Sequence, residues 1–191
     1  MGRMIATSAV LLGCVFAPAA MADAVSDFYK GRTVEIIVGA GAGGGYDANA
    51  RLVARHFSRF VPGNPSIVVT NMPGGGGITA ANVLYNVSAK EGLTLGTFTN
   101  AMLTEPLMGN SAIKFDSSKF TWIGSANNEV STCISWHTAA VKTFDQLRNT
   151  ELIIGGDGPS ADGEPFARVI NASFDTRIKI VSGYPGGNAI N

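Results

Sequence analysis

The sequence has no excess of charge of either sign, and few of its residues are charged at all. Fourteen Lys and Arg residues balance fourteen Asp and Glu residues, and 15% of the 191 residues are charged. Without a basic run, the chain lacks the electrostatic footprint of a nucleic-acid-binding protein, so we expect no nucleic-acid partner. Its length suits one large domain or two small ones, and no internal sequence repeat is visible.

Residues that commonly carry catalysis or bind metals are also scarce. The only histidines, His56 and His137, have no evident partner and do not stand at metal-ligand spacing. Neither a Walker sequence nor a G-x-S-x-G elbow is present. We therefore expect no catalytic residues, no metal site and no cofactor.

The N-terminus has the composition of a secretory signal peptide. Arg3 precedes an apolar run from Ile5 to Phe16, and Ala20-Met21-Ala22 matches the A-x-A cleavage pattern. This predicts a signal peptide over residues 1–22, cut after Ala22. The run is too short for a membrane anchor, which needs about 20 apolar residues. We expect a periplasmic protein, with a lipoprotein form starting at Cys14 as the minor alternative.

Cysteine occurs only as Cys14 and Cys133. Cleavage after Ala22 would leave Cys133 as the only thiol and so exclude an intramolecular disulfide. Cys133 stands in the alternating run from Val130 to Trp136, which is typical of a strand. We expect a buried structural cysteine rather than a nucleophile.

Glycine, in contrast, is abundant, and its 24 residues gather in discrete turns. The stretch Val34 to Val38, four β-branched apolar residues interrupted by Glu35, predicts a buried strand, and the next seven residues contain five glycines. A helical pattern follows. Gly lets successive backbone N–H groups converge, and a helix N-terminus adds partial positive charge, so this turn is a candidate anion cradle.

The same turn also matches the dinucleotide fingerprint as Gly39-x-Gly41-x-x-Gly44. That motif expects an acidic residue at the end of the second strand to hold the ribose, whereas the second strand here ends at Thr70-Asn71. A periplasmic location would also separate the protein from the cytosolic nicotinamide pool. A dinucleotide-dependent oxidoreductase, or a hydrolase that uses the glycine turns, stays as the enzymatic alternative.

The helix predicted over Asp47 to Phe60 has Asp47 as its candidate N-cap. Its apolar stripe consists of Leu52, Val53, Phe57 and Phe60. Arg51, Arg55 and Arg59 stand four apart on another face, which we interpret as solvated rather than as an anion patch.

Strands and helices alternate along the rest of the chain. Further strands are predicted at 66–70, 93–98, 151–154 and 178–182, strand-like runs at 120–124 and 129–136, and helices at 78–86, 143–148 (N-cap Thr143) and 165–172. This rhythm is typical of parallel α/β sheets with right-handed crossovers. We predict a first α/β lobe over residues 23–120 and a partial second α/β lobe over 121–191.

Several ordered motifs resemble one family, the extracytoplasmic solute-binding proteins of tripartite tricarboxylate transporters (the Bug family). The motifs are Phe28-Tyr29-Lys30-Gly31-Arg32-Thr33-Val34, Gly43-Gly44-Gly45-x-Asp47 with Ala50-Arg51, Asn71-x-Pro73-Gly74-x-Gly76-Gly77, Lys90-x-Gly92-x-Thr94-Leu95-Gly96, Gly155-Gly156 and Tyr184-Pro185-Gly186-Gly187. The family's usual first turn begins Pro-aromatic, where this chain has Gly39 and Ala40.

The resemblance implies a periplasmic-binding-protein fold, in which two α/β lobes close around a cleft. The ligand would be a small carboxylate, and the partners would be the membrane permease subunits that receive it. In the family the carboxylate is held largely by backbone N–H groups and waters. The resemblance thus implies these ligand-binding residues: Gly43, Gly44, Gly45, Tyr46, Asp47, Asn100, Gly155, Gly156, Asp157, Gly158, Ser160 and Tyr184. A sensory carboxylate-binding module is a further alternative.

Two further expectations concern the first turn and the end of the chain. We expect a positive φ at Gly44 or Gly45, so that valine at either position would block the ligand. Two-lobed binding proteins return to the first lobe from their C-terminal part, so the chain is expected to be C-terminally truncated. No strand should then follow 178–182, and residues 183–191 should be poorly anchored.

Overall fold

The computed structural model describes residues 19–128, 130–161 and 163–185, with side chains from residue 24 onward. Most of the predicted signal peptide, including Cys14, lies outside this part, as do residues 186–191 at the C-terminal end. Helix α1 (Ala19–Tyr29) leads into the first strand. None of the described helices is long and apolar enough to cross a membrane.

The first part of the chain forms a parallel sheet of three strands, β1 (Thr33–Val38), β2 (Ser66–Asn71) and β3 (Thr94–Thr97). The strand order is β2-β1-β3. The register pairs Val38 with Asn71 on one side and with Thr97 on the other. The turns that follow β1 and β2 therefore leave the sheet side by side at its carboxyl edge.

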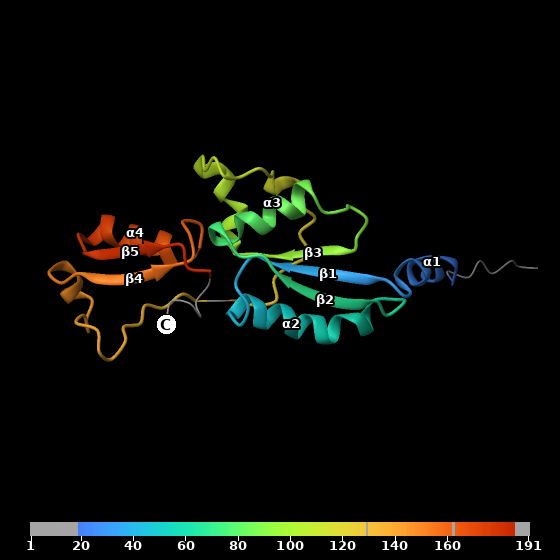
Figure 1. The fold of residues 1–191 in the computed structure, drawn as a ribbon, viewed down its shortest axis with the longest axis horizontal. Helices are drawn as coiled ribbons and strands as arrows, with labels where there is room; N and C mark the ends of the chain where they lie inside the picture. Colours follow the sequence, from blue (N-terminus) through green and yellow to red (C-terminus); the bar gives the residue numbers. More distant parts are fainter. Residues whose placement is uncertain (1–18, 129, 162, 186–191) are drawn as a thin grey trace, which may run out of the picture.

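Two helices cover the two faces of this sheet (Figure 1), α2 (Gly45–Phe57) on one side and α3 (Ile78–Asn86) on the other. Four of the six residues of the central strand β1 are apolar, and its Ile36 and Val38 pack against Ala50 of α2. On the opposite face, Ile78 and Ala81 of α3 form a second cluster with Met102 and Phe115. Burial on both faces explains the near-continuous apolar run of β1.

The second part of the chain forms a smaller parallel sheet of two strands, β4 (Leu152–Gly156) and β5 (Ile178–Ser182). Helix α4 (Gly163–Phe174) connects them. The arrowheads of both sheets point toward each other, so their carboxyl edges face one another across the middle of the molecule (Figure 1). The molecule is therefore mixed α/β with parallel sheets.

Short 3₁₀ segments complete the described secondary structure: η1 (Ser58–Phe60), η2 (Gly75–Gly77), η3 (Asn100–Leu103), η4 (Glu105–Met108), η5 (Ser117–Lys119) and η6 (Asp145–Arg148). The helix expected at 143–148 is thus only η6. Its N-cap is Phe144 rather than Thr143. The predicted boundary between lobes at residue 120 stays a prediction.

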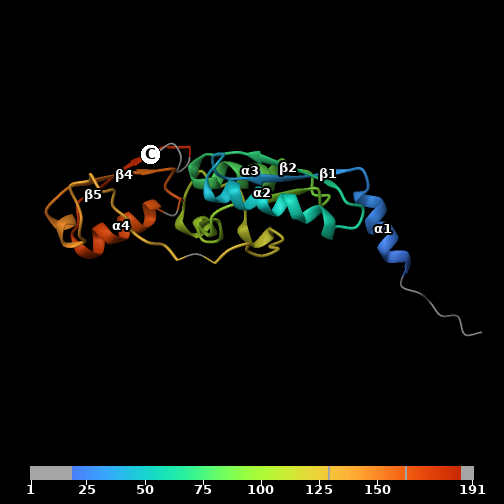
Figure 2. The ribbon, with the colours of Figure 1, turned by 90° about the horizontal axis from the view of Figure 1, so that it is seen from below.

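The strands expected at 120–124 and 129–136 are wrong for the residues described there. Residues 121–128 and 130–136 carry no regular structure, and the stretch runs extended between the two sheets (Figure 2). A strand needs a neighbour for its N–H and C=O groups, which alternation in sequence does not supply. Cys133 is consequently exposed, not buried.

The apolar stripe expected along 47–60 is also mostly exposed, and only its Phe57 is half-buried. Leu52 is 53% exposed and Phe60 is 72% exposed. The face that meets the sheet carries Asp47 and Ala50, with Ala54 partly buried beside them. Small side chains let the helix backbone approach the sheet closely, and this approach turns the larger residues outward.

Met102 provides a test of the second cluster. Its side chain is fully buried, so Met102→Ala should lower the free energy of unfolding by about 2–5 kcal/mol, from lost apolar contact and the cavity left behind. Met108 is 78% exposed, and Met108→Ala should change the free energy of unfolding by less than about 0.5 kcal/mol. Urea unfolding of both variants measures the difference; equal losses would contradict the assignment of this core.

Candidate functional site

The first glycine turn joins β1 to α2, as expected, but its backbone differs from the expectation. The left-handed residue is Gly43, with φ of 80°. Gly44 is the N-cap of α2 and has a φ of −76°. Gly45 is not one of the described glycines that have a positive φ. The expectation of a positive φ at Gly44 or Gly45 is therefore wrong by one position. Within residues 39–45, Gly43 alone adopts a conformation that other residues rarely adopt.

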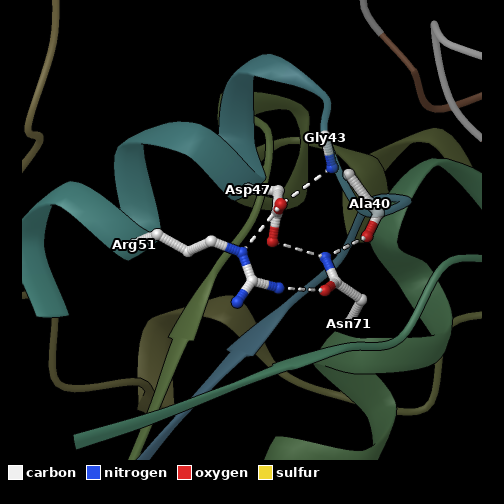
Figure 3. Close-up of polar contacts among 5 residues, drawn as sticks. All are labelled: Ala40, Gly43, Asp47, Arg51 and Asn71. Atoms are coloured by element: carbon white, nitrogen blue, oxygen red, sulfur yellow. Dashed lines mark hydrogen bonds and ion pairs between the residues drawn. The ribbon is translucent and has the colours of Figure 1, made fainter.

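Asp47 is the third residue of α2 rather than its N-cap, which corrects the sequence prediction. Its side chain turns back into the protein and is only 3% exposed. The carboxylate Oδ2 accepts a hydrogen bond of 2.7 Å from the Gly43 N–H (Figure 3). The carboxylate thus holds the glycine turn itself.

Two further side chains complete this network (Figure 3). Arg51, one helical turn further along α2, donates from Nε to Asp47 Oδ2 at 3.0 Å and forms an ion pair with it. Asn71, at the end of β2, donates from Nδ2 to Asp47 Oδ1 at 2.9 Å and to the Ala40 carbonyl at 3.1 Å. Asn71 Oδ1 also accepts from the Arg51 guanidinium at 3.0 Å. The turn is therefore tied to both the helix and the neighbouring strand.

This environment keeps Asp47 ionised. The hydrogen bond from Arg51, followed by that from the Gly43 N–H, lowers the pKa of Asp47 from 3.8 to about 2, against the opposing effect of burial. The same pairing raises the pKa of Arg51. Asp47 is buried, whereas the Arg51 side chain is 46% exposed, so the pair joins a fixed carboxylate to an arginine that still reaches solvent.

The second glycine turn, Gly74 to Gly77, joins β2 to α3. All four residues have positive φ, at 137°, 58°, 69° and 103°. The turn lies next to the first turn, because a Cβ placed on Gly39 would come within 3.0 Å of the Gly77 Cα. Four consecutive left-handed residues require glycine, and this requirement accounts for the run in the sequence.

The loop that follows β4, residues 157–161, packs directly on this second turn. The Gly76 N–H donates to the Asp157 carbonyl at 3.2 Å. A Cβ on Gly76 would lie 2.5 Å from the Ala161 N, and one on Gly158 would lie 2.7 Å from the Gly76 N. The second glycine turn and the loop after β4 therefore meet backbone to backbone, through glycines.

Ser160 is buried at this junction. Its carbonyl oxygen accepts from Thr99 Oγ1 at 3.5 Å, and the residue is fully inaccessible. Within the described part of the chain, its hydroxyl Oγ has no hydrogen-bond partner. Buried polar atoms are almost always paired, so this hydroxyl marks the junction as a place where a further group could bind.

The structure gathers most of the predicted site residues into two groups. Gly43, Gly44, Gly45 and Asp47 form the first turn, and Tyr46 packs against the cluster of Ile36, Val38 and Ala50. Gly155 and Gly156 end β4, and Asp157, Gly158 and Ser160 form the loop at the junction. The Tyr184 N–H donates to the Gly156 carbonyl at 3.0 Å, and Asn100 is exposed at the start of η3.

Sequence reasoning missed four residues that the structure places here: Asn71, Thr99, Glu164 and Ser182. Each of the two parallel units, β1-α2-β2 (the first unit) and β4-α4-β5 (the second unit), contains a buried carboxylate with an arginine four positions later. The pairs are Asp47–Arg51 and Glu164–Arg168. This i, i+4 spacing on a helix is readable from sequence. The partners at the strand ends, Asn71 and Ser182, could not be found from this spacing.

A groove beside the first sheet and the distribution of possible metal ligands also bear on the role of the glycine turns. An open groove of about 370 Å³ is lined by Arg51, Ala54, Arg55, Ile67 and Val69, on the side of the first sheet that α2 covers. None of its lining residues belongs to the glycine turns or to the loop after β4. No group of three or more His, Cys, Asp or Glu side chains in the described part of the chain could hold a metal ion.

The network around Asp47 predicts a pH-dependent stability. Because the folded pKa of about 2 lies below the ordinary value of 3.8, the ionised carboxylate stabilises the folded protein above about pH 5, and this contribution is lost as the pH falls toward about 2. Asp47→Asn should therefore cost about 1–3 kcal/mol near neutral pH and progressively less in acid.

Denaturant unfolding at several pH values measures this difference. Asp145→Asn, at an exposed position, should cost less than about 0.5 kcal/mol throughout. A cost for Asp47→Asn that stays constant from about pH 5 to pH 2 would contradict the ionised network.

Comparison with known proteins bears on the fold. No protein-family model matches the chain, and no curated protein matches it in sequence. One solved structure that it resembles is described as that of a periplasmic transporter, with a TM-score of 0.63 at 20% sequence identity. The match covers 84% of this chain and 55% of that chain, so this chain spans little more than half of its length. The likeness establishes a fold shared with part of a periplasmic transporter.

Proposed function

We propose that this protein is an extracytoplasmic solute-binding receptor that captures a small carboxylate between two α/β lobes. The bound carboxylate would then pass to the permease subunits of a tripartite tricarboxylate transporter. The fold likeness to a periplasmic transporter supports the general class. The ordered motifs that resemble the Bug family support the finer assignment.

The observation that carries the proposal is the junction of the two sheets. The glycine turns after β1 and β2 and the loop after β4 all leave the carboxyl edges of parallel strands, and the second turn contacts the loop. Open α/β sheets bind ligands at this edge. The buried Ser160 hydroxyl, which lacks a partner in the described part of the chain, lies at the same place.

A carboxylate can bind there without a basic patch. The first N–H groups of a helix have no intrahelical acceptor, and the helix dipole favours an anion near them. Helices α2 and α4 both begin at the ends of glycine turns. This accounts for how a chain with a formal net charge of zero could recognise an acidic ligand.

The dinucleotide alternative loses support at Asn71. This residue ends β2, where the fingerprint expects an acidic side chain for the ribose, and its amide is occupied by Asp47, Arg51 and Ala40. A sensory module would use the same cleft, and only physiology separates it from a transport receptor. Loss of carboxylate uptake on deletion of the gene would favour transport.

A thermal-shift screen tests the proposed function. Di- and tricarboxylates should raise the midpoint of unfolding in a concentration-dependent way, because a ligand that binds only the folded state stabilises it. Nucleotides should leave the midpoint unchanged. Stabilisation by NAD alone would overturn the transport proposal in favour of an enzyme.

Ser160 gives a sharper test. Ser160→Ala removes a buried hydroxyl, so it should leave the free energy of unfolding unchanged or raise it by up to about 1 kcal/mol. If the hydroxyl donates to the bound carboxylate, the same change should weaken binding about tenfold, the equivalent of about 1.4 kcal/mol. Isothermal titration with the best carboxylate from the screen measures this loss, with Ser131→Ala at an exposed position as the control.

An unchanged affinity in Ser160→Ala would remove Ser160 from the ligand site. A large loss of stability would instead indicate that the hydroxyl has a structural partner.

A further inference from the structure

We infer that Asp47 and Glu164 are matched positioning residues. Asp47 holds the first glycine turn, and Glu164 holds the loop after β4, each in the conformation that binds the ligand. The inference rests on the proposed function and assigns a role to Glu164, which no motif singled out. Neither carboxylate is proposed to touch the ligand.

The two carboxylates occupy equivalent places in the topology. In the first unit the chain runs from β1 through a glycine turn to α2 and β2, and Asp47 is the third residue of α2. In the second unit it runs from β4 through a glycine-containing loop to α4 and β5, and Glu164 is the second residue of α4. Both pairs of strands are parallel. The match is one of structure, since the sequence shows no repeat.

The contacts of the two carboxylates also correspond. Asp47 accepts from the Gly43 N–H at 2.7 Å, and Glu164 accepts from the Gly158 N–H at 3.1 Å. In both cases the donor belongs to the turn and has a positive φ, of 80° at Gly43 and 141° at Gly158. Each carboxylate therefore fixes a left-handed glycine that precedes its helix.

Each carboxylate has the same two kinds of additional partner. An arginine one helical turn later forms an ion pair, Arg51 with Asp47 at 3.0 Å and Arg168 with Glu164 at 3.5 Å. The last residue of the neighbouring strand donates a hydrogen bond. This residue is Asn71 at 2.9 Å in the first unit and Ser182 at 2.8 Å in the second.

The burial of the two carboxylates indicates that these networks do more than cap the start of a helix. Asp47 is 3% exposed and Glu164 is fully buried. Burying a carboxylate is costly unless it is paired and hydrogen-bonded, and an exposed N-cap side chain would satisfy the helix at lower cost. What the buried position adds is a rigid turn, with the negative charge compensated by arginine so that an approaching anion is less repelled.

The loop after β4 is also shaped around Glu164. A Cβ on Gly156 would collide with the Glu164 side chain, and a Cβ on Gly158 would collide with the backbone of the second glycine turn. Glu164 therefore fixes the same loop that meets Gly76 at the junction. Loosening Glu164 should disturb the ligand site from the second unit, as loosening Asp47 should from the first.

The test compares Asp47→Asn and Glu164→Gln with the parent in the full chain. Both variants keep the size of the side chain but remove its charge. Isothermal titration with succinate and with citrate as probes, well below the unfolding midpoint, should show affinity lowered at least tenfold in each variant. The backbone amide signals of Gly43 and Gly158 in ¹H–¹⁵N spectra should move in the respective variant, which a general loss of stability would not produce.

Glu151→Gln and Arg55→Gln are the matched controls, because both residues are exposed and lie outside the networks. They should bind within twofold of the parent. If Asp47→Asn or Glu164→Gln does not fold, Arg51→Gln and Ser182→Ala, which each remove one partner of a carboxylate, take their place with the same expectations.

An affinity within twofold of the parent in a folded variant would overturn the inference, as would an unmoved amide signal at Gly43 or Gly158. If the parent binds neither probe, the proposed function fails for these carboxylates. The positioning role is then decided by the two amide signals alone.

Discussion

The two parts of this protein meet where the backbone of the second glycine turn lies directly against the backbone of the loop after β4. Gly76 donates its N–H to the Asp157 carbonyl, and any Cβ at Gly76 or Gly158 would collide with the opposing main chain. This contact requires a run of left-handed residues that only glycine adopts readily. Because the contact joins the carboxyl edges of both sheets, it also determines which loops face each other and therefore where a ligand could be enclosed.

Glycine turns are mobile unless something holds them, and here two buried carboxylates do so. Asp47 and Glu164 each accept a hydrogen bond from a glycine N–H of the turn, and each is compensated by an arginine on the same helix. The ionised form of Asp47 is strongly favoured, with a pKa of about 2. Under the proposed function, these contacts hold the backbone donors of the turns in place, as recognition of an anion by main-chain groups would require.

The regular elements of the first unit could be predicted because their signals are local. Burial on both faces gives β1 an apolar run that only Glu35 interrupts, and the glycine turns separate β1 from α2 and β2 from α3. The same reasoning failed at 120–124 and 129–136, where apolar residues alternate but the described residues carry no strand. It failed again at the apolar stripe of α2, because alanine and a buried aspartate form the contact face instead.

The sequence by itself determined where the strands of the two sheets and the glycine turns lie, since glycine, β-branched residues and helix spacing act over a few neighbouring positions; it did not exclude strands at 120–124 and 129–136, where none forms among the described residues. It also placed Asp47 four residues before Arg51, which lies within one helical turn. Only the tertiary structure decided that Asn71 joins Asp47 from 24 positions away, and that Thr99 reaches Ser160 from 61 positions away. Contacts at that separation depend on how strands pair and helices pack, and no local pattern encodes them.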